Sequence, residues 1–80
     1  LRASAVHWVS APPEVGSAVL ARVRYHAALA PARVAHLDDA GFELAFERPV
    51  GAVAPGQAAV LYALDGREVF GGGTIEESRR

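Results

Sequence analysis

Short runs of alternating apolar and polar residues, separated by turn-forming residues, dominate this sequence. In the clearest run, Phe42, Leu44 and Phe46 alternate with Glu43, Ala45 and Glu47, and a period of two is typical of a half-buried strand. Turns recur about every eight to twelve residues. This pattern predicts an all-β domain, an antiparallel barrel or sandwich, and closure into a barrel would also protect the strand edges. The expected strands lie at 5–9, 18–26, 32–37, 42–47, 57–64 and 67–75.

Turn-forming residues mark the boundaries between these runs. Asp38 to Gly41 and Asp65-Gly66 each predict a short hairpin connection, the second a tight two-residue turn. The best helical candidate, Ala27 to Ala30, is too short to stand before Pro31.

Composition excludes several classes of chemistry. The chain has 80 residues, which is one domain, and it contains no cysteine, so disulfides, thiolate zinc sites and cysteine nucleophiles are impossible. All eight basic residues are arginines, which excludes Schiff-base, Walker-type and carrier lysines. No apolar stretch approaches the ~20 residues of a membrane span, and no signal peptide opens the chain. Since position 1 is not methionine, we expect a piece of a longer protein.

The second run carries the strongest binding pattern. Arg22, Arg24 and His26 share one strand face over ~13 Å, which is about two phosphate spacings, and Tyr25 lies between them in sequence. A tyrosine ring stacks on bases, so this face suits a nucleic acid. The competing interpretation is a solvated outer face, paired across the sheet with Glu43 and Glu47. The pattern alone favours neither, and the net charge of −1 gives no general attraction to polyanions.

Two glycine motifs have structural explanations. No helix can follow Gly71-Gly72-Gly73, so the triplet predicts a bulge or a close backbone approach at a barrel corner rather than a phosphate loop. Pro55-Gly56 predicts a turn before a strand, which would hold the Gln57 amide where it can meet a partner.

No catalytic or metal site is expected. His7, His26 and His36 fall on three different strands without a closely spaced carboxylate, so they predict no metal centre. The serines lack a nucleophile-elbow context, and Trp8 is most simply a core anchor.

Three segments, in order and with matching spacing, resemble the C-terminal domain of the tRNA-specific 2-thiouridylases, whose older label is tRNA (5-methylaminomethyl-2-thiouridylate)-methyltransferase. The segments are Arg22-Val23-Arg24-Tyr25, Ala52 to Tyr62 (AVAPGQAAVLY) and Phe70 to Ile75 (FGGGTI), and His7-Trp8-Val9 resembles the family's Asn/His-Trp segment. The resemblance covers nearly all of the chain.

This resemblance implies that residues 1–80 form a single six-stranded, translation-factor-like β-barrel at the C-terminus of a longer cytoplasmic enzyme. The N-terminal ATP-pyrophosphatase domain and a central domain would lie outside the chain. In the family, ATP with magnesium activates the C2 oxygen of the wobble uridine, and a cysteine persulfide, supplied through a sulfur-carrier protein, delivers the sulfur. The barrel itself would use no cofactor.

What the resemblance assigns to the barrel is tRNA contact. The family's Arg-Tyr pair matches Arg24 and Tyr25, and its glutamine after Pro-Gly matches Gln57. Beside these, we expect Arg22 to be a secondary phosphate partner. His26 replaces a usual arginine and Ala54 a usual threonine, which weakens the positive charge near position 26. The alternative is a structural barrel that packs on neighbouring domains and never meets RNA.

Overall fold

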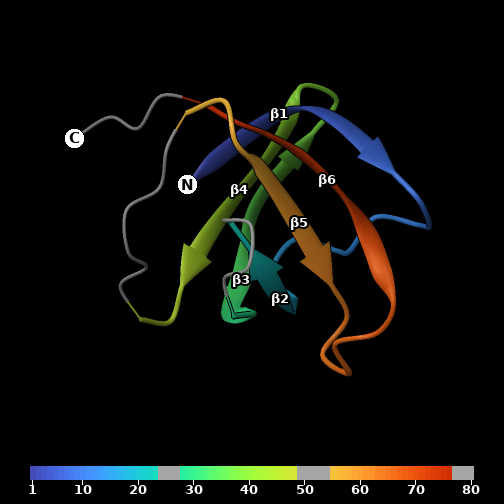
Figure 1. The fold of residues 1–80 in the computed structure, drawn as a ribbon. Coiled ribbons are helices and arrows are strands. Elements are labelled where there is room, and N and C mark those ends of the chain that lie inside the picture. Colours follow the sequence, from blue (N-terminus) through green and yellow to red (C-terminus); the bar gives the residue numbers. More distant parts are fainter. Residues whose placement is uncertain (24–27, 49–54, 77–80) are drawn as a thin grey trace.

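The computed structural model describes residues 1–23, 28–48 and 55–76, and within these ranges the chain forms a closed antiparallel barrel with no helix. The order around the barrel is β1-β4-β3-β2-β5-β6, and β6 pairs with β1 to complete it (Figure 1). The all-β prediction and its barrel form are therefore confirmed. The six strands are β1 (Arg2–Trp8), β2 (Ala18–Arg22), β3 (Ala30–Asp38), β4 (Gly41–Phe46), β5 (Ala58–Tyr62) and β6 (Val69–Ile75).

The core combines a few large side chains with many small ones. Phe42, Leu61, Val19 and Val34 are the largest fully buried residues. The remaining core positions are Ala3, Ala21, Val23, Ala32, Leu44, Ala59 and Ile75. Small barrels mix small and large inward side chains because the interior is narrow, and this explains why an alanine-rich sequence closes around so small a core.

The glycine triplet lies inside β6, in the part of the strand that pairs with the end of β1. Gly71 has a φ of 152°, and a Cβ there would collide with the backbone oxygen of His7 and lie 2.8 Å from the Cα of Trp8. A Cβ on Gly73 would lie 2.8 Å from the backbone oxygen of Ser4. The predicted close backbone approach is confirmed, because β1 and β6 meet where β6 carries no side chains.

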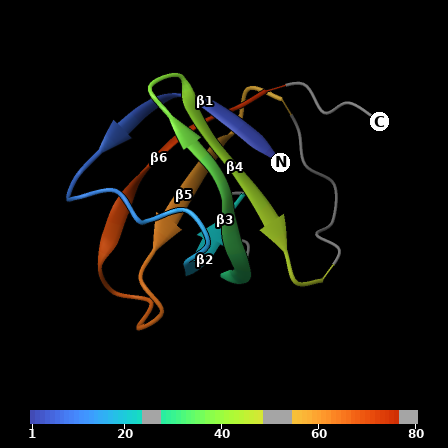
Figure 2. The ribbon, with the colours of Figure 1, turned by 180° about the vertical axis from the view of Figure 1, so that it is seen from behind.

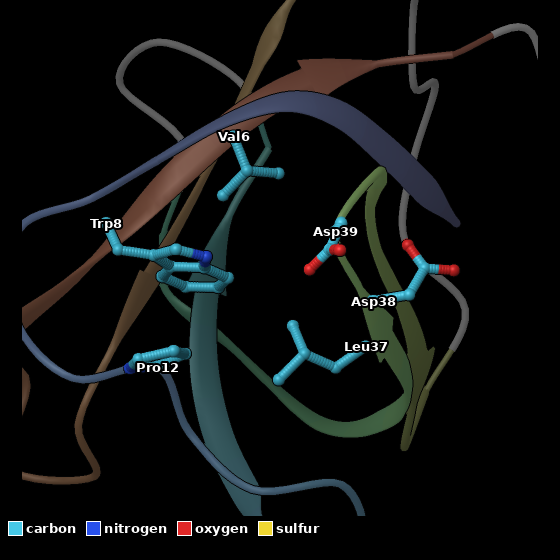
Figure 3. A pocket seen from close by; sticks show the side chains of 6 residues that line it. All are labelled: Val6, Trp8, Pro12, Leu37, Asp38 and Asp39. Carbon is cyan, nitrogen blue, oxygen red and sulfur yellow. The ribbon is translucent and has the colours of Figure 1, made fainter.

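The strand ladders of the described residues contain three register shifts, one of them between Leu61 and Tyr62 in the β5–β6 pair, and the other two turn side chains toward one pocket. In β1 the register shifts between Ser4 and His7, and Ala5 adopts a φ of 53°. In β3 it shifts between Val34 and His36. A bulge redirects the side chains that follow it. Val6 and Trp8 therefore face Leu37 across a pocket (Figure 3).

The connection from β1 to β2 runs across the barrel from β6 to β3 (Figure 2). The N–H of Ser10 donates to the carbonyl of Phe70 at 3.3 Å, and the N–H of Gly16 donates to Val34 at 2.7 Å. These hydrogen bonds fix the two ends of the 9–17 segment, which follows Trp8 directly.

Some predicted boundaries are wrong. β1 begins at Arg2 rather than at position 5, and β3 begins before Pro31. The predicted two-residue turn at Asp65-Gly66 is a longer loop, since the last ladder pair joins Tyr62 to Val69. The Asp65 carboxylate accepts hydrogen bonds from the N–H groups of Arg67 and Glu68. These hydrogen bonds stabilise the turn at residues 65–68 and lower the pKa of Asp65.

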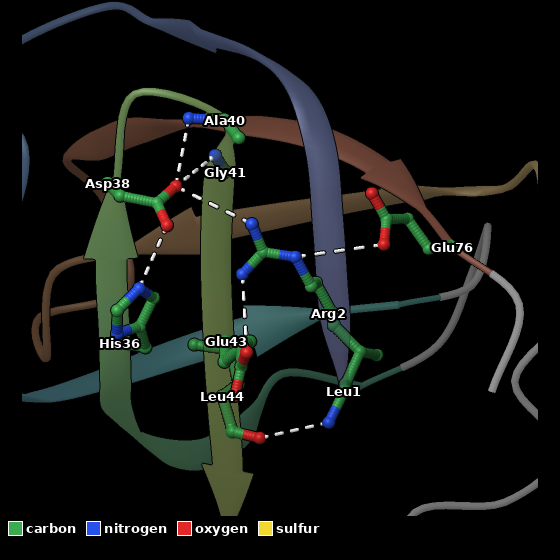
Figure 4. Close-up of polar contacts among 9 residues, drawn as sticks. All are labelled: Leu1, Arg2, His36, Asp38, Ala40, Gly41, Glu43, Leu44 and Glu76. Atoms are coloured by element: carbon green, nitrogen blue, oxygen red, sulfur yellow. Dashed lines mark hydrogen bonds and ion pairs between the residues drawn. The ribbon is translucent and has the colours of Figure 1, made fainter. Parts of the chain in front are cut away.

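Arg2 joins three strands of the barrel through ion pairs (Figure 4). Its guanidinium lies 3.2 Å from Glu43 on β4, 3.5 Å from Asp38 at the end of β3 and 3.7 Å from Glu76 after β6. The preceding N-terminal amine donates to the carbonyl of Leu44 at 3.1 Å. These contacts attach the start of β1 to both of its neighbours.

Asp38 organises the β3–β4 turn (Figure 4). Its Oδ1 accepts hydrogen bonds from the N–H groups of Ala40 and Gly41, and its Oδ2 lies 2.8 Å from Nε2 of His36. The hydrogen bond with His36 is the main reason that the pKa of Asp38 falls from 3.8 to about 2. The N–H group of Ala40 lowers this pKa further, desolvation partly opposes the shift, and the N–H group of Gly41 and the charge of Arg2 make smaller lowering contributions.

We predict that Gly71→Ala destabilises the barrel by an amount near or above the upper end of the ~0.5–3 kcal/mol that is common for single substitutions. The reason is that the new Cβ collides with the backbone of β1, which has no flexible side chain to move away. Thermal and urea unfolding would measure the loss. Gly16→Ala is the control, because Gly16 also has a positive φ of 91° but has open space around it. Equal losses in the two variants would contradict this explanation.

We also predict that Asp38 contributes to stability in a pH-dependent way. Since its folded-state pKa is about 2 against an ordinary 3.8, the contribution is present above the ordinary value and is lost as the pH falls through about 2. Asp38→Asn keeps an Oδ1 acceptor for the turn but removes this titration. Its urea midpoint should fall less than that of the parent between about pH 5 and pH 2.

The control for this titration is Asp39→Asn, which removes a neighbouring exposed carboxylate and leaves the bonds of Asp38 in place. It should retain the steep loss of stability in acid. If Asp38→Asn followed the same pH course as the parent, Asp38 would not be the source of that loss.

Candidate nucleic-acid interface

Arg22 is the last residue of β2, and its side chain lies along the neighbouring strand β5. Its Cα pairs with that of Val60, and its Cζ lies 5.5 Å from the centroid of the Tyr62 ring. A guanidinium held over an aromatic face gains a cation–π attraction and loses conformational freedom. Tyr62 thus orients Arg22 on the outer surface of the barrel.

Among the residues that the structure describes, the guanidinium of Arg22 has unused hydrogen-bonding capacity. Its Nε is buried and has no hydrogen-bond partner. By contrast, Arg33 donates to the carbonyl of Gly16 at 2.6 Å, and Arg2 is surrounded by carboxylates. An unpaired buried donor costs about 1–3 kcal/mol. Unlike Arg2 and Arg33, Arg22 therefore has no partner for its Nε, and its guanidinium can donate to an external acceptor such as a phosphate.

Gln57 and Arg22 lie at the same end of the barrel. Its carbonyl accepts a hydrogen bond from Ile75 at 2.8 Å, and the preceding Gly56 has a φ of 90°. Because β2 and β5 are antiparallel, the end of β2 lies beside the start of β5. Gln57 precedes Val60, the partner of Arg22, by three positions, a distance of ~10 Å along the chain. Gln57 is exposed at the rim of this end of the barrel.

A row of outward positions extends from Arg22 around the barrel. Arg22 pairs with Val60, Val60 with Gly72, and Gly72 with His7 on β1. Gly72 has no side chain, so the middle of the row is low and its two ends carry a guanidinium and an imidazole. Sequence reasoning did not predict that His7 and Tyr62 belong to the surface around Arg22. A two-residue alternation along β5 does put Tyr62 on the same face as Val60.

Charge is divided between the two halves of the barrel. The adjacent strands β2, β5 and β6 contain no aspartate or glutamate. Asp38 and Glu43 lie on the other half, which consists of β1, β4 and β3. The half that carries Arg22 therefore has no strand carboxylate to repel a polyanion.

Two of the four predicted contact residues can be compared with the structure, and two cannot. Arg22 and Gln57 lie at one end of the barrel, whereas Arg24 and Tyr25 lie outside the described residues and stay predictions. The alternative pairing of the second-strand cations with Glu43 is wrong for Arg22. In the barrel β3 separates β4 from β2, and Glu43 pairs with Arg2 instead.

One statement about the histidines needs correction. His36 does have a close carboxylate, Asp38, at 2.8 Å, because residues two apart in β3 point to the same face of the strand. Within residues 1–23, 28–48 and 55–76, no group of three or more His, Asp or Glu side chains is placed to hold a metal ion. The same residues include no helix with the length and apolar character of a membrane span.

Comparison with known proteins gives a consistent result. Residues 1–75 match the family described as the aminomethyltransferase beta-barrel domain. The chain is 42% identical over 80 residues to the tRNA-specific 2-thiouridylase MnmA of Deinococcus radiodurans, covering all of this chain and 20% of the relative. It is 45% identical over 75 residues to that of Bordetella avium, covering 94% of this chain and 20% of the relative.

The chain spans about a fifth of the length of these curated relatives. The match nevertheless covers almost every residue of the barrel, including the strands that carry Arg22, Gly72 and His7. This chain therefore belongs to the aminomethyltransferase beta-barrel domain family, and it resembles the corresponding segment of tRNA-specific 2-thiouridylases.

Proposed function

We propose that this chain is a tRNA-binding barrel, the C-terminal domain of a cytoplasmic tRNA 2-thiouridylase. Its relatives carry the name tRNA-specific 2-thiouridylase, which supports tRNA as the partner. The observation that carries the proposal is the Arg22 guanidinium, which Tyr62 orients on a half of the barrel without strand carboxylates.

Each proposed contact has a separate task. Arg22 provides a charge-assisted hydrogen bond to a phosphate, which positions the RNA without reading its sequence. Gln57 offers an amide that both donates and accepts at the rim of the barrel. Arg24 and Tyr25 follow Val23 directly in the sequence, and we assign them a phosphate or base-edge contact and a stacking contact.

The chemistry of thiolation belongs to the rest of the enzyme. We propose that ATP with magnesium is bound there, together with a central domain and a sulfur-carrier protein as partners. The described residues do not fit a phosphate loop, because Gly71 to Gly73 lie within β6 and no helix N-terminus follows them. In this proposal the barrel holds the substrate while the reaction takes place elsewhere in the enzyme.

A second candidate is a barrel that packs against neighbouring domains without touching RNA. The half-buried pair of Val60 and Gly72 favours this possibility, since uncharged surface of this kind can also pack against another protein domain. The two candidates differ in what a salt titration shows, because phosphate contacts release counterions and apolar packing does not.

We predict that Arg22→Ala weakens tRNA binding by about fivefold near 0.1 M salt and lowers the salt slope by about 1, as expected for one lost phosphate contact. Fluorescence anisotropy at several salt concentrations would measure both quantities. Arg67→Ala is the matched control, since Arg67 is an exposed arginine in the loop after β5. Equal affinities of these two variants would remove Arg22 from the interface.

We predict a different outcome for Gln57→Ala. Losing a neutral hydrogen bond should weaken binding by about threefold and leave the salt slope unchanged. Amide chemical shifts on addition of tRNA should change near Arg22 and Gln57. If no shifts occurred at all, the packing role would replace the RNA-binding role.

A further inference from the structure

A pocket of about 450 Å³ lies between the end of β1 and the β3–β4 turn. Val6, Trp8 and Pro12 line one side, and Leu37 and Asp39 face them from the other (Figure 3). Asp38 completes the lining. The pocket therefore has apolar walls and a carboxylate rim, and it lies apart from the surface around Arg22.

The walls of the pocket are held in place. The bulges in β1 and β3 turn Val6, Trp8 and Leu37 toward the same space. The Trp8 ring packs on buried Phe42, with the ring centroids 5.8 Å apart and the planes tilted by 45°. The indole is thus packed against the core while the side chain stays partly exposed to a ligand.

The two aspartates have different roles. The carboxylate of Asp38 points away from the pocket and is engaged by Arg2, His36 and the turn (Figures 3 and 4). The carboxylate of Asp39 points into the pocket, toward Trp8 (Figure 3). Within the described part of the chain, Asp39 makes no side-chain hydrogen bond or ion pair, so its charge is available.

Two carboxylates line the pocket, Asp38 and Asp39. Arg2 and His36 already partner Asp38, whereas no ion pair of the described residues involves Asp39. The uncompensated carboxylate of Asp39 therefore repels a phosphate and attracts a cation.

We propose that this pocket receives an arginine side chain from a partner protein. A guanidinium is planar, so it can stack on the Trp8 indole while its N–H groups pair with the Asp39 carboxylate. The methylene groups of the arginine would lie against Leu37 and Val6. A lysine ammonium is more strongly hydrated and lacks the planar face, so it fits the same walls less well.

The inference goes beyond tRNA binding and gives the barrel two separate surfaces. The half whose strands carry no carboxylate suits RNA, while the pocket with the free Asp39 carboxylate suits a basic segment of protein. The Asp39 carboxylate would repel the phosphates of RNA, and the Arg22 guanidinium would repel a basic protein segment. An RNA and a partner protein would therefore bind to different sides of the barrel.

Trp8 makes this proposal directly measurable, because it is the only tryptophan in the chain. We would titrate the 80-residue chain with N-acetyl-arginine amide and follow Trp8 fluorescence, together with the amide shifts of residues 37–39. The expected result is a saturable change with a midpoint on the order of 1 mM, as is typical of a ligand of this size. Asp39→Asn should raise that midpoint about fivefold, as expected for losing a partly exposed ion pair.

The controls test whether binding of the arginine compound depends on its guanidinium and on the charge of Asp39. Glu68→Gln removes the same charge in the β5–β6 loop, which lies at the other end of the barrel from the β3–β4 turn (Figure 1), and it should leave the midpoint unchanged. N-acetyl-citrulline amide has the same shape without the charge and should not bind at matched ionic strength. N-acetyl-lysine amide should bind more weakly than the arginine compound.

Besides one result on self-association, four binding results would overturn the proposal. These are equal binding of citrulline and arginine, equal binding of lysine and arginine, an unchanged midpoint in Asp39→Asn, or binding of guanosine without binding of arginine, which would make the pocket a nucleobase site. Self-association of the chain that Asp39→Asn abolishes would assign the pocket to a second copy and would likewise contradict a distinct partner.

Discussion

The contact between β6 and β1 is the constraint on which the rest of the barrel depends. β6 passes the backbone of β1 at Gly71 and Gly73, where a Cβ would meet the carbonyls of His7 and Ser4. This close approach joins the last strand to the first and removes both edges of the sheet. It also brings Gly72 to the outer surface, where it connects Val60 to His7 in one low row.

Once the barrel is closed, its strand order separates charges that are mixed in the sequence. Arg22 lies on β2 and Glu43 on β4, and β3 lies between these two strands in the sheet, so the two side chains cannot pair. Carboxylates therefore gather around Arg2 and the β3–β4 turn, while β2, β5 and β6 have none. The separation gives a small domain of net charge −1 two surfaces with opposite preferences.

Sequence reasoning succeeded where local rules decide the structure. The alternation around Phe42 and Leu44 predicted a half-buried strand, and the glycine triplet predicted a close backbone approach. It failed where a bulge changes the period, because an extra residue cannot be seen in an alternation pattern. The pocket between Trp8 and Leu37 was missed for this reason. The pairing of His36 with Asp38 was missed although their spacing of two residues already puts both on one face of a strand.

The sequence by itself determined the fold class, the likeness to 2-thiouridylases, and Arg22 and Gln57 as candidate contacts, since these follow from short motifs and a two-residue period. The tertiary structure alone decided which strands are neighbours. That choice placed Tyr62 under Arg22, took Glu43 away from β2 and turned Asp39 toward Trp8. The physical reason is that strand pairing and bulges are fixed by contacts between residues far apart in the chain, which no local pattern records.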